Sequence, residues 1–302
     1  MDQFQAIRVF ARVVEAGNFT KAAESLQMPK ATVTKLIQSL EAHLRVKLLQ
    51  RTTRRVTVTA DGAAYYERTT RLVNELEDIE ASLAHAQSNP HGRLRIDVPA
   101  SLARVVIIPA LPRFIARYPD ISVDVGVSDR RVDLLEDNVD CVIRGGPLTD
   151  SSLIARRLGG LTWATCATPE YLKHHGVPKK PEDLLNGHTV VSYFSSQSGR
   201  VMPFRFRPKG TQEEELEIEG RRLVGVNDSN AYLTAGLASL GVLQLPCFAL
   251  LEHINSGALV PILKDWDREP LAVHVLYPSN RHLSRKVRVF IDWAAELFEQ
   301  TP

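Results

Sequence analysis

The stretch from Thr20 to Thr59 constrains the fold of this chain more than any other. Residues 17–18, a glycine and an asparagine, tolerate positive φ and are expected to end a preceding helix over residues 2–16. Thr20 is the candidate N-cap of a short helix that follows. After a turn at residues 27–28, Pro29 fits the first turn of a further helix, where no backbone N–H is needed. That helix carries one apolar stripe, formed by Val33, Ile37, Leu40 and Leu44.

The opposite face of this further helix is polar and cationic. Hydroxyl and cationic side chains bind phosphate oxygens and base edges, and the DNA major groove, about 12 Å wide, admits a helix. We therefore expect the face to contact DNA through Lys30, Ala31, Thr32, Thr34, Lys35 and Gln38.

The residues from Arg51 to Thr59 alternate β-branched side chains, which predicts a strand and a short hairpin. A basic hairpin tip can lie along the DNA backbone or enter a narrow minor groove. The expected contacts here are Arg51, Thr53, Arg54 and Arg55. The pattern over residues 1–60 thus predicts a winged helix-turn-helix domain that binds double-stranded DNA.

The distribution of charge supports this assignment. Residues 1–60 contain ten Lys and Arg and four Asp and Glu, a net charge of +6, whereas the whole chain carries +2 and the remainder therefore −4. Positive charge is concentrated in the part expected to meet phosphate. The alternative is that these lysines and arginines are solvated surface charges without a partner.

A long helix is predicted over residues 61–88, after a cap at Thr59. Apolar residues recur there at alternating steps of four and three, which is typical of helices that pair with another helix. The positions are Tyr65, Thr69, Leu72, Leu76, Ile79, Leu83 and Ala86. We expect this linker helix to dimerise the protein; the alternative is that it packs on its own domain.

After a turn-rich break at residues 88–92, strands and helices alternate to the end of the chain, which predicts an α/β region with mostly parallel sheets. A helix is expected over 101–118, kinked or divided by its prolines, and another over 132–137. The segment 271–277 and the last helix are expected to complete the first sheet. Residues 93–302 then form two lobes, one from 93–163 with 269–302 and the other from 164–268.

Several motifs carry a resemblance to a known family. They are F-x-x-I-R-x-F from Phe4, A-G-N-F-T-K-A-A-E-S-L from Ala16, A-T-V-T-K-L-I-Q-S-L-E-A-H-L from Ala31, L-L-Q-R-T-T-R-R from Leu48 and T-A-D-G from Thr59. Residues 1–62 resemble the DNA-binding end of LysR-type transcriptional regulators, and the resemblance continues through the whole chain. It implies a linker helix that pairs subunits, tetramers built from two dimers, and a periplasmic-binding-protein-like effector domain. Pro29 stands where family members often carry a serine, so the phosphate contact of that serine is not carried over.

A small-molecule effector is expected between the two lobes, where strands end and helices begin. The family resemblance places its inducer at these loops. The candidate effector-binding residues are Ser101, Leu102, Arg144, Gly145, Asn227, Asp228 and Pro246. Arg144 and two helix N-termini favour an anionic or polar effector. The alternatives are that Ser101 and Asp228 are only helix caps, and that Arg144 pairs with a structural carboxylate such as Asp129.

Other features narrow the function. No apolar run of about 18 residues predicts a membrane span, and the N-terminus has no secretory pattern. Three widely spaced cysteines suit a reducing compartment, so a cytoplasmic protein is expected. Cys166 could sense oxidant or could be a small buried hydrophobic residue.

No cofactor fingerprint, nucleophile–base pair or metal-ligand spacing is found, so neither an enzyme nor a cofactor is expected. The prediction is a cytoplasmic, effector-responsive transcription regulator that binds DNA as a dimer of dimers. A redox-responsive regulator and a small-solute-binding protein are the alternatives. The effector, the operator and the direction of regulation are left open.

Overall fold

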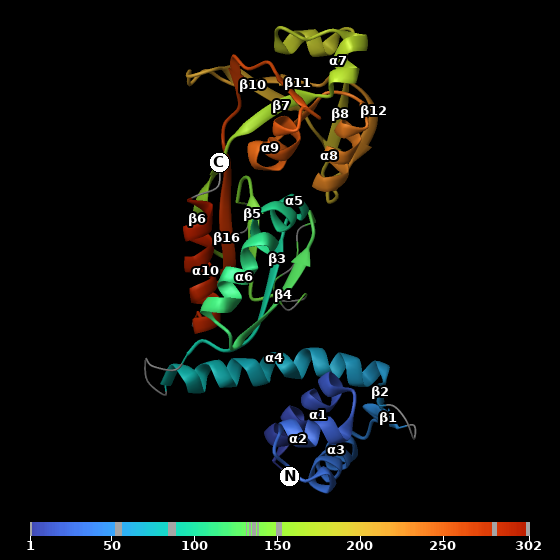
Figure 1. Ribbon diagram of the computed structural model, residues 1–302. Coiled ribbons are helices and arrows are strands. Elements are labelled where there is room, and N and C mark those ends of the chain that lie inside the picture. The colour runs from blue at the N-terminus through green and yellow to red at the C-terminus, as the bar shows by residue number, and fades with distance from the viewer. Residues whose placement is uncertain are drawn as a thin grey trace. The chain divides into compact units, whose positions relative to one another are not determined.

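The computed structural model describes residues 2–51, 56–83, 89–130, 132, 134, 137, 139–148, 153–279 and 283–299. The chain forms two compact units, one of residues 1–88 and one of residues 89–302 (Figure 1).

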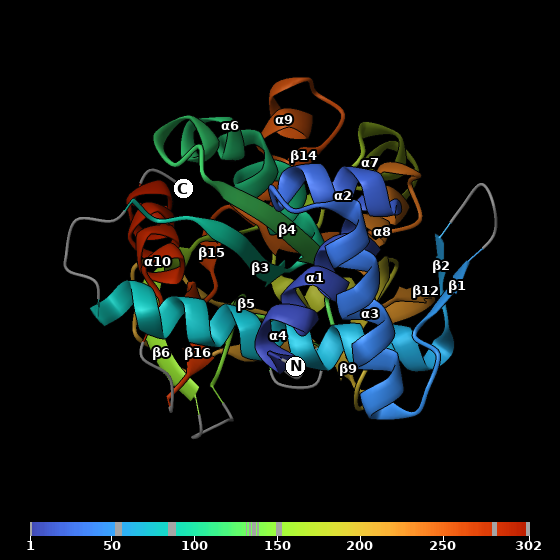
Figure 2. The ribbon, with the colours of Figure 1, turned by 90° about the horizontal axis from the view of Figure 1, so that it is seen from below.

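The first unit contains a helical head and a long helix (Figure 2). Its elements are α1 (Gln3–Ala16), α2 (Phe19–Ser25), α3 (Lys30–Leu44), β1 (Leu49–Arg51), β2 (Val56–Val58) and α4 (Ala60–Leu83). Gly17 ends α1 with a φ of 60°. The N-cap of α2 is Asn18 and not Thr20, because the Asn18 backbone is extended and its Oδ1 accepts from the N–H of Thr20 at 2.7 Å.

The core of the head is formed by α1, α2 and α3. Its fully buried side chains include Ala6, Phe10, Val13, Ala22, Val33, Ile37 and Leu40. Three of the four stripe positions of α3 are therefore buried as predicted, while Leu44 is half-buried at the helix end. Helix α4 closes this core, since the ring of Tyr65 packs against Phe10 with centroids 5.7 Å apart.

The first lobe of the second unit is a five-stranded sheet in the order β4-β3-β5-β16-β6. Its strands are β3 (Gly92–Val98), β4 (Ile121–Val127), β5 (Cys141–Gly145), β6 (Leu153–Leu161) and β16 (Leu271–Pro278). Helices α6 (Ile108–Arg117) and α10 (Arg285–Phe298) cover the sheet and meet through Phe114 and Phe290, whose rings stand edge to face. Strand β16 thus lies in the first sheet, between β5 and β6, as the sequence analysis expects.

The sheets are mixed and not mostly parallel. Strand β3 runs parallel to β4 and β5, but β16 runs antiparallel to β5 and β6. The reason is the connection: β16 enters the first lobe from the second by a short extended segment, without the crossover helix that a parallel strand requires.

The helical run after β3 is continuous. It comprises α5 (Ala100–Leu102), a π-helical segment (Ala103–Ile107) and α6, and Pro109 stands in the first turn of α6. The wider π-turn accommodates the proline without ending the helix. The helix predicted over 132–137 is not found, since the described residues 132, 134 and 137 are not helical; the other three lie outside the described residues.

The second lobe contains three small sheets, in the orders β13-β7-β14, β12-β8-β9 and β11-β10-β15. The strands are β7 (Trp163–Ala167), β8 (Thr189–Phe194), β9 (Val201–Met202), β10 (Phe204–Pro208), β11 (Leu216–Ile218), β12 (Arg221–Val226), β13 (Leu243–Pro246), β14 (Val260–Ile262) and β15 (Trp266–Asp267). The helices are α7 (Pro169–His175), the 3-10 turn Pro181–Leu185, α8 (Ser229–Leu237) and α9 (Cys247–Asn255).

The chain passes between the lobes twice, between β6 and β7 and again between β15 and β16 (Figure 1). At this crossover the guanidinium of Arg268 lies 3.7 Å from the ring centroid of Trp163 and donates to Gln244 Oε1 at 3.0 Å. Burial lowers the pKa of Arg268 to about 10, so the group remains a cation at neutral pH.

Candidate nucleic-acid interface and effector cleft

The predicted DNA-contacting face of α3 is free of the head core. Lys30, Ala31, Thr32, Lys35 and Gln38 are exposed and Thr34 is half-buried. Pro29 is the N-cap and supplies no side-chain hydrogen bond, so the amides of the first turn have no side-chain acceptor. Free amides at a helix N-terminus attract phosphate, and Lys30 stands at the same end. The arrangement suits a helix that approaches a phosphate with its N-terminus.

The wing is fixed to α3 by a buried carboxylate. Glu41 Oε1 accepts from the backbone N–H groups of Leu48 at 3.0 Å and Leu49 at 3.2 Å, and Oε2 accepts from Lys47 Nζ at 2.8 Å. Burial acts to raise the pKa of Glu41, but these hydrogen bonds outweigh it and the pKa is lowered. Strands β1 and β2 are paired antiparallel beyond this anchor. Thr53, Arg54 and Arg55, and the side chain of Arg51, lie outside the described residues.

Helix α4 starts where predicted, because Thr59 Oγ1 accepts from Gly62 N at 2.9 Å. Tyr65 packs against the core of its own head, and this packing role needs no partner subunit. Leu72, by contrast, is 60% exposed, and Leu76 is half-buried. The side chains of Ile79 and Leu83 lie outside the described residues.

The two lobes are joined by a carboxylate that was not among the predicted site residues. Asp129 Oδ1 accepts from the N–H of Ala100 at 2.9 Å, at the start of the first-lobe helical run. Its Oδ2 accepts from the N–H of Ser229 at 2.5 Å, at the start of α8 in the second lobe. One carboxylate thus binds the N-termini of helices from both lobes.

Further hydrogen bonds join the lobes beside Asp129. The N–H of Ser101 donates to Ser229 Oγ at 3.0 Å, and Arg104 Nε donates to Asn230 Oδ1 at 3.0 Å. The predicted residue Ser101 therefore lies where the lobes meet and contributes its backbone N–H to the contact.

The other predicted second-lobe residues have local roles. The side chain of Asp228 caps α8 by accepting from Ala231 N at 2.8 Å, and the carbonyl of Asn227 accepts from the hydroxyl of Tyr193 at 3.3 Å. Pro246 is the buried N-cap of α9. Leu102, in the first lobe, belongs to the hydrophobic core of its lobe.

Arg144, predicted to bind an effector, has its charge engaged by groups of its own lobe, and its effector role stays a prediction. The guanidinium forms an ion pair with Asp97 and also donates to the carbonyls of Ile143 at 2.8 Å and Arg130 at 3.2 Å. Burial raises the pKa of Asp97, and the contact with Arg144 opposes that rise. The partner is thus a structural carboxylate, but Asp97 and not Asp129. At the adjacent Gly145, a Cβ would lie 2.8 Å from Leu271 Cδ2, so the Leu271 side chain would have to shift.

Cys166 is fully buried on β7. Burial raises the pKa of its thiol to about 12, and Cys247 adds to the rise, so the thiol is protonated at neutral pH. This environment favours the interpretation as a small buried hydrophobic residue. Within the described ranges no group of three His, Cys, Asp or Glu side chains is placed to hold a metal ion, and no helix is long and apolar enough to cross a membrane.

Both units match families of known proteins. Residues 4–63 match the lysR family of bacterial regulatory helix-turn-helix proteins, and residues 87–299 match the LysR substrate binding domain. An HTH-type transcriptional repressor of Pseudomonas aeruginosa is 40% identical over 302 residues, which is 100% of this chain and 94% of that protein. The HTH-type transcriptional regulator YhjC of Escherichia coli is 38% identical over 99% of both chains. The solved structure of CrgA, a LysR-type transcriptional regulator from Neisseria meningitidis, superposes with a TM-score of 0.61 at 29% identity, covering 97% of this chain and 98% of that one.

Proposed function

The chain belongs to the LysR family of DNA-binding transcription regulators, and we propose that it responds to a small organic anion bound between the lobes of its second unit. The observation that carries this proposal is the Asp129 bridge. Both carboxylate oxygens accept from the first turn of a helix, one helix in each lobe. A cleft that binds the protein's own carboxylate in this way presents the donors that an effector carboxylate requires.

In this proposal the effector replaces Asp129. Its carboxylate takes the amides of Ala100 and Ser229, while Asp129 leaves the cleft. The selectivity for an anion then comes from backbone amides and not from Arg144, which is held by Asp97. The exchange alters the contacts that join the lobes, and an effector shifts the equilibrium between two lobe arrangements only by the difference in its affinity for them.

Calorimetric titration of the full-length protein with a panel of small aliphatic and aromatic monocarboxylates tests this proposal. Asp129→Asn keeps one acceptor oxygen, but its amide N–H₂ cannot accept from the N–H of the second helix. The side chain at position 129 therefore competes less well with an effector carboxylate. The affinity for the carboxylate should rise about tenfold, since a charge-assisted hydrogen bond contributes about 1.5 kcal/mol or more. Carboxylates that bind neither the natural chain nor the variant would contradict the proposal, as would a variant that binds them less tightly.

For the first unit we propose that a dimer formed through α4 presents two α3 helices to a two-fold operator, and that two dimers assemble into a tetramer. Lys30, Thr32, Thr34 and Lys35 are the proposed groove contacts, and Arg51, Arg54 and Arg55 the contacts to backbone or minor groove. The exposed polar face of α3 supports the first set.

A gel-shift titration at several salt concentrations checks the proposed interface. Lys35→Gln should weaken binding and reduce the slope of log K against log salt by about one. Lys173→Gln, which removes an exposed lysine from α7 of the second unit, is the matched control and should leave the slope unchanged. Equal slopes for the two variants would show that Lys35 of α3 does not contact DNA phosphate.

A further inference from the structure

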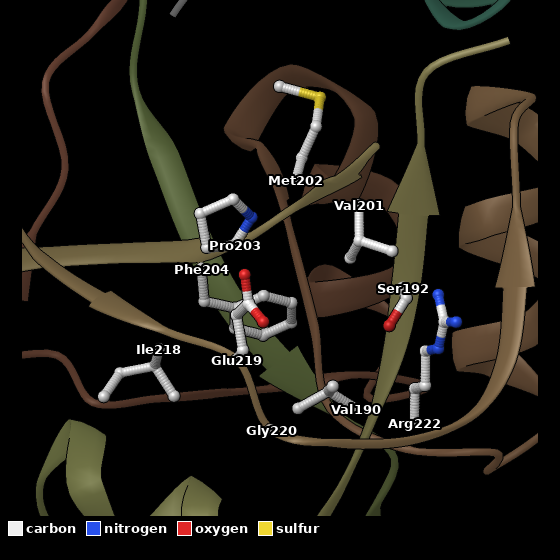
Figure 3. A pocket seen from close by; sticks show the side chains of 10 residues that line it. All are labelled: Val190, Ser192, Val201, Met202, Pro203, Phe204, Ile218, Glu219, Gly220 and Arg222. Carbon is white, nitrogen blue, oxygen red and sulfur yellow. The ribbon is translucent and has the colours of Figure 1, made fainter. Parts of the chain in front are cut away.

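A cavity in the second lobe is separate from the cleft that Asp129 bridges. It lies between one face of β8 and the ribbon formed by β10 and β11, and its volume is about 320 Å³ (Figure 3). This volume lies at the lower end of the range of about 300–1,000 Å³ found for small-molecule sites. Its floor is apolar and is formed by Val190, Phe204 and Ile218, all buried.

The cavity contains one deeply buried polar side chain, that of Ser192. The residue is only 4% exposed, and its hydroxyl points toward the cavity in Figure 3. The hydroxyl takes part in none of the hydrogen bonds found among the described residues. The hydroxyl is open to the cavity, so a ligand group there can form a hydrogen bond with it.

Two opposite charges stand at the rim of the same cavity. Glu219 and Arg222 both line it and are both exposed (Figure 3). Neither forms an ion pair within the described part of the chain, although oppositely charged residues elsewhere in this lobe, such as Arg205 and Glu217, do so. A ligand that carries one positive and one negative group matches this pair of side chains.

We propose that this cavity binds a small zwitterion with an apolar body, namely an α-amino acid with an apolar side chain. Arg222 binds its carboxylate, Glu219 its ammonium group and Ser192 one of its polar atoms, while Val190, Phe204 and Ile218 contact the side chain. A simple carboxylate of the same shape leaves Glu219 beside a second negative charge, and is therefore a poorer ligand.

Strand β8 separates this site from the effector cleft. Val190 and Ser192 face the cavity, whereas Val191 and Tyr193 point to the other face and pack with Tyr232 and Leu233 of α8. The N-terminus of α8 receives Asp129. The two sites thus lie on opposite faces of one strand, and the amino-acid site does not depend on the proposed anion site.

Isothermal titration calorimetry of the full-length protein tests the proposal with L-leucine and L-phenylalanine as probes. The matched analogues are 4-methylpentanoate, which lacks the ammonium group, and 3-methylbutylamine, which lacks the carboxylate. Saturable binding of an amino acid is expected, with each analogue at least about tenfold weaker, because a hydrogen bond to a charged group is lost. Absence of binding by both amino acids at millimolar concentration overturns the proposal, as does equal binding of the analogues.

Four variants locate the ligand. Arg222→Gln should weaken binding at least about tenfold, whereas Arg221→Gln, its exposed neighbour on β12 that does not line the cavity, should not change it. Ser192→Leu should abolish binding by filling the cavity, and its thermal unfolding shows whether the lobe is intact. Asp129→Asn should leave amino-acid binding unchanged. Equal effects of the two arginine variants, or loss of binding in Asp129→Asn, would place the ligand elsewhere and refute the site.

Discussion

The anchor of the wing on α3 gives the most direct test of how this head is held together. Replacing Glu41 with glutamine keeps the shape of the side chain and one acceptor oxygen. It removes the negative charge that receives the amides of Leu48 and Leu49 and the ammonium of Lys47. Lys47 itself is 77% exposed, so its ion pair contributes only about 0–1 kcal/mol.

The larger loss is expected at the two buried amides. A hydrogen bond to a charged acceptor contributes about 1.5–3 kcal/mol and one to a neutral acceptor about 0.5–1.5 kcal/mol. Two such exchanges amount to about 2 kcal/mol, which corresponds to a local opening about 30 times more frequent. Hydrogen–deuterium exchange of the peptide that spans residues 45–58 measures this opening in the full-length protein.

Lys47→Gln is the matched control, because it breaks the same ion pair but leaves the Glu41 carboxylate on the two amides. Its exchange should accelerate less than about fivefold. If Lys47→Gln matched Glu41→Gln, or if neither changed the exchange, the wing would not be anchored by the buried carboxylate.

The pH dependence of the same exchange follows from the lowered pKa of Glu41. A carboxyl whose pKa is lower in the folded state stabilises the fold at pH values above its ordinary pKa of 4.5. This stabilisation is lost as the pH falls through the pKa of the folded state. As the pH is lowered, the wing of the natural chain should therefore lose protection from hydrogen exchange at a higher pH than the core of α1 does. In the Glu41→Gln variant this difference should disappear.

Three other outcomes are expected. Gly62→Ala places a Cβ 2.1 Å from the carbonyl oxygen of Leu48, so the wing must shift, with a cost of about 1–3 kcal/mol that gel-shift affinity and hydrogen exchange detect. Leu72→Glu puts a charge on the exposed face of α4 and should weaken self-association at least about 30-fold in sedimentation velocity, if this face pairs the subunits. With its pKa near 12, Cys166 should react with iodoacetamide at pH 8 about a thousand times more slowly than a free thiol, and the half-buried Cys247 should be labelled first. Rapid labelling of Cys166 would instead support the alternative in which this thiol senses oxidant.

Patterns repeated within one segment were predictable from the sequence. The apolar stripe of α3 and the cap at Thr59 both depend on neighbours within about a turn or two of the same element. The fold class follows from these patterns and from the family resemblance, and both matched family domains agree with it. The N-cap of α2 was misplaced by two residues because Asn18 and Thr20 are both acceptors, and only the backbone dihedral angles decide between them.

Contacts between distant segments were not predictable in the same way. The donors to Asp129 lie 29 and 100 residues away, and Arg144 pairs with Asp97, 47 residues away on a neighbouring strand. Nothing in the local sequence of Asp129 distinguishes it from a solvated loop carboxylate. Strands β9, β10, β11 and β15 were not predicted, because each has only two to five residues and depends on its partners for pairing.

The stacking of Arg268 on Trp163 bears on where the chain leaves the second lobe. Trp163 pairs with Pro246 of β13, and Arg268 donates to Gln244 of the same strand. Both segments that cross between the lobes are therefore fastened to one strand of the second lobe. A rotation of one lobe against the other would then have to be taken up on the first-lobe side of these two residues.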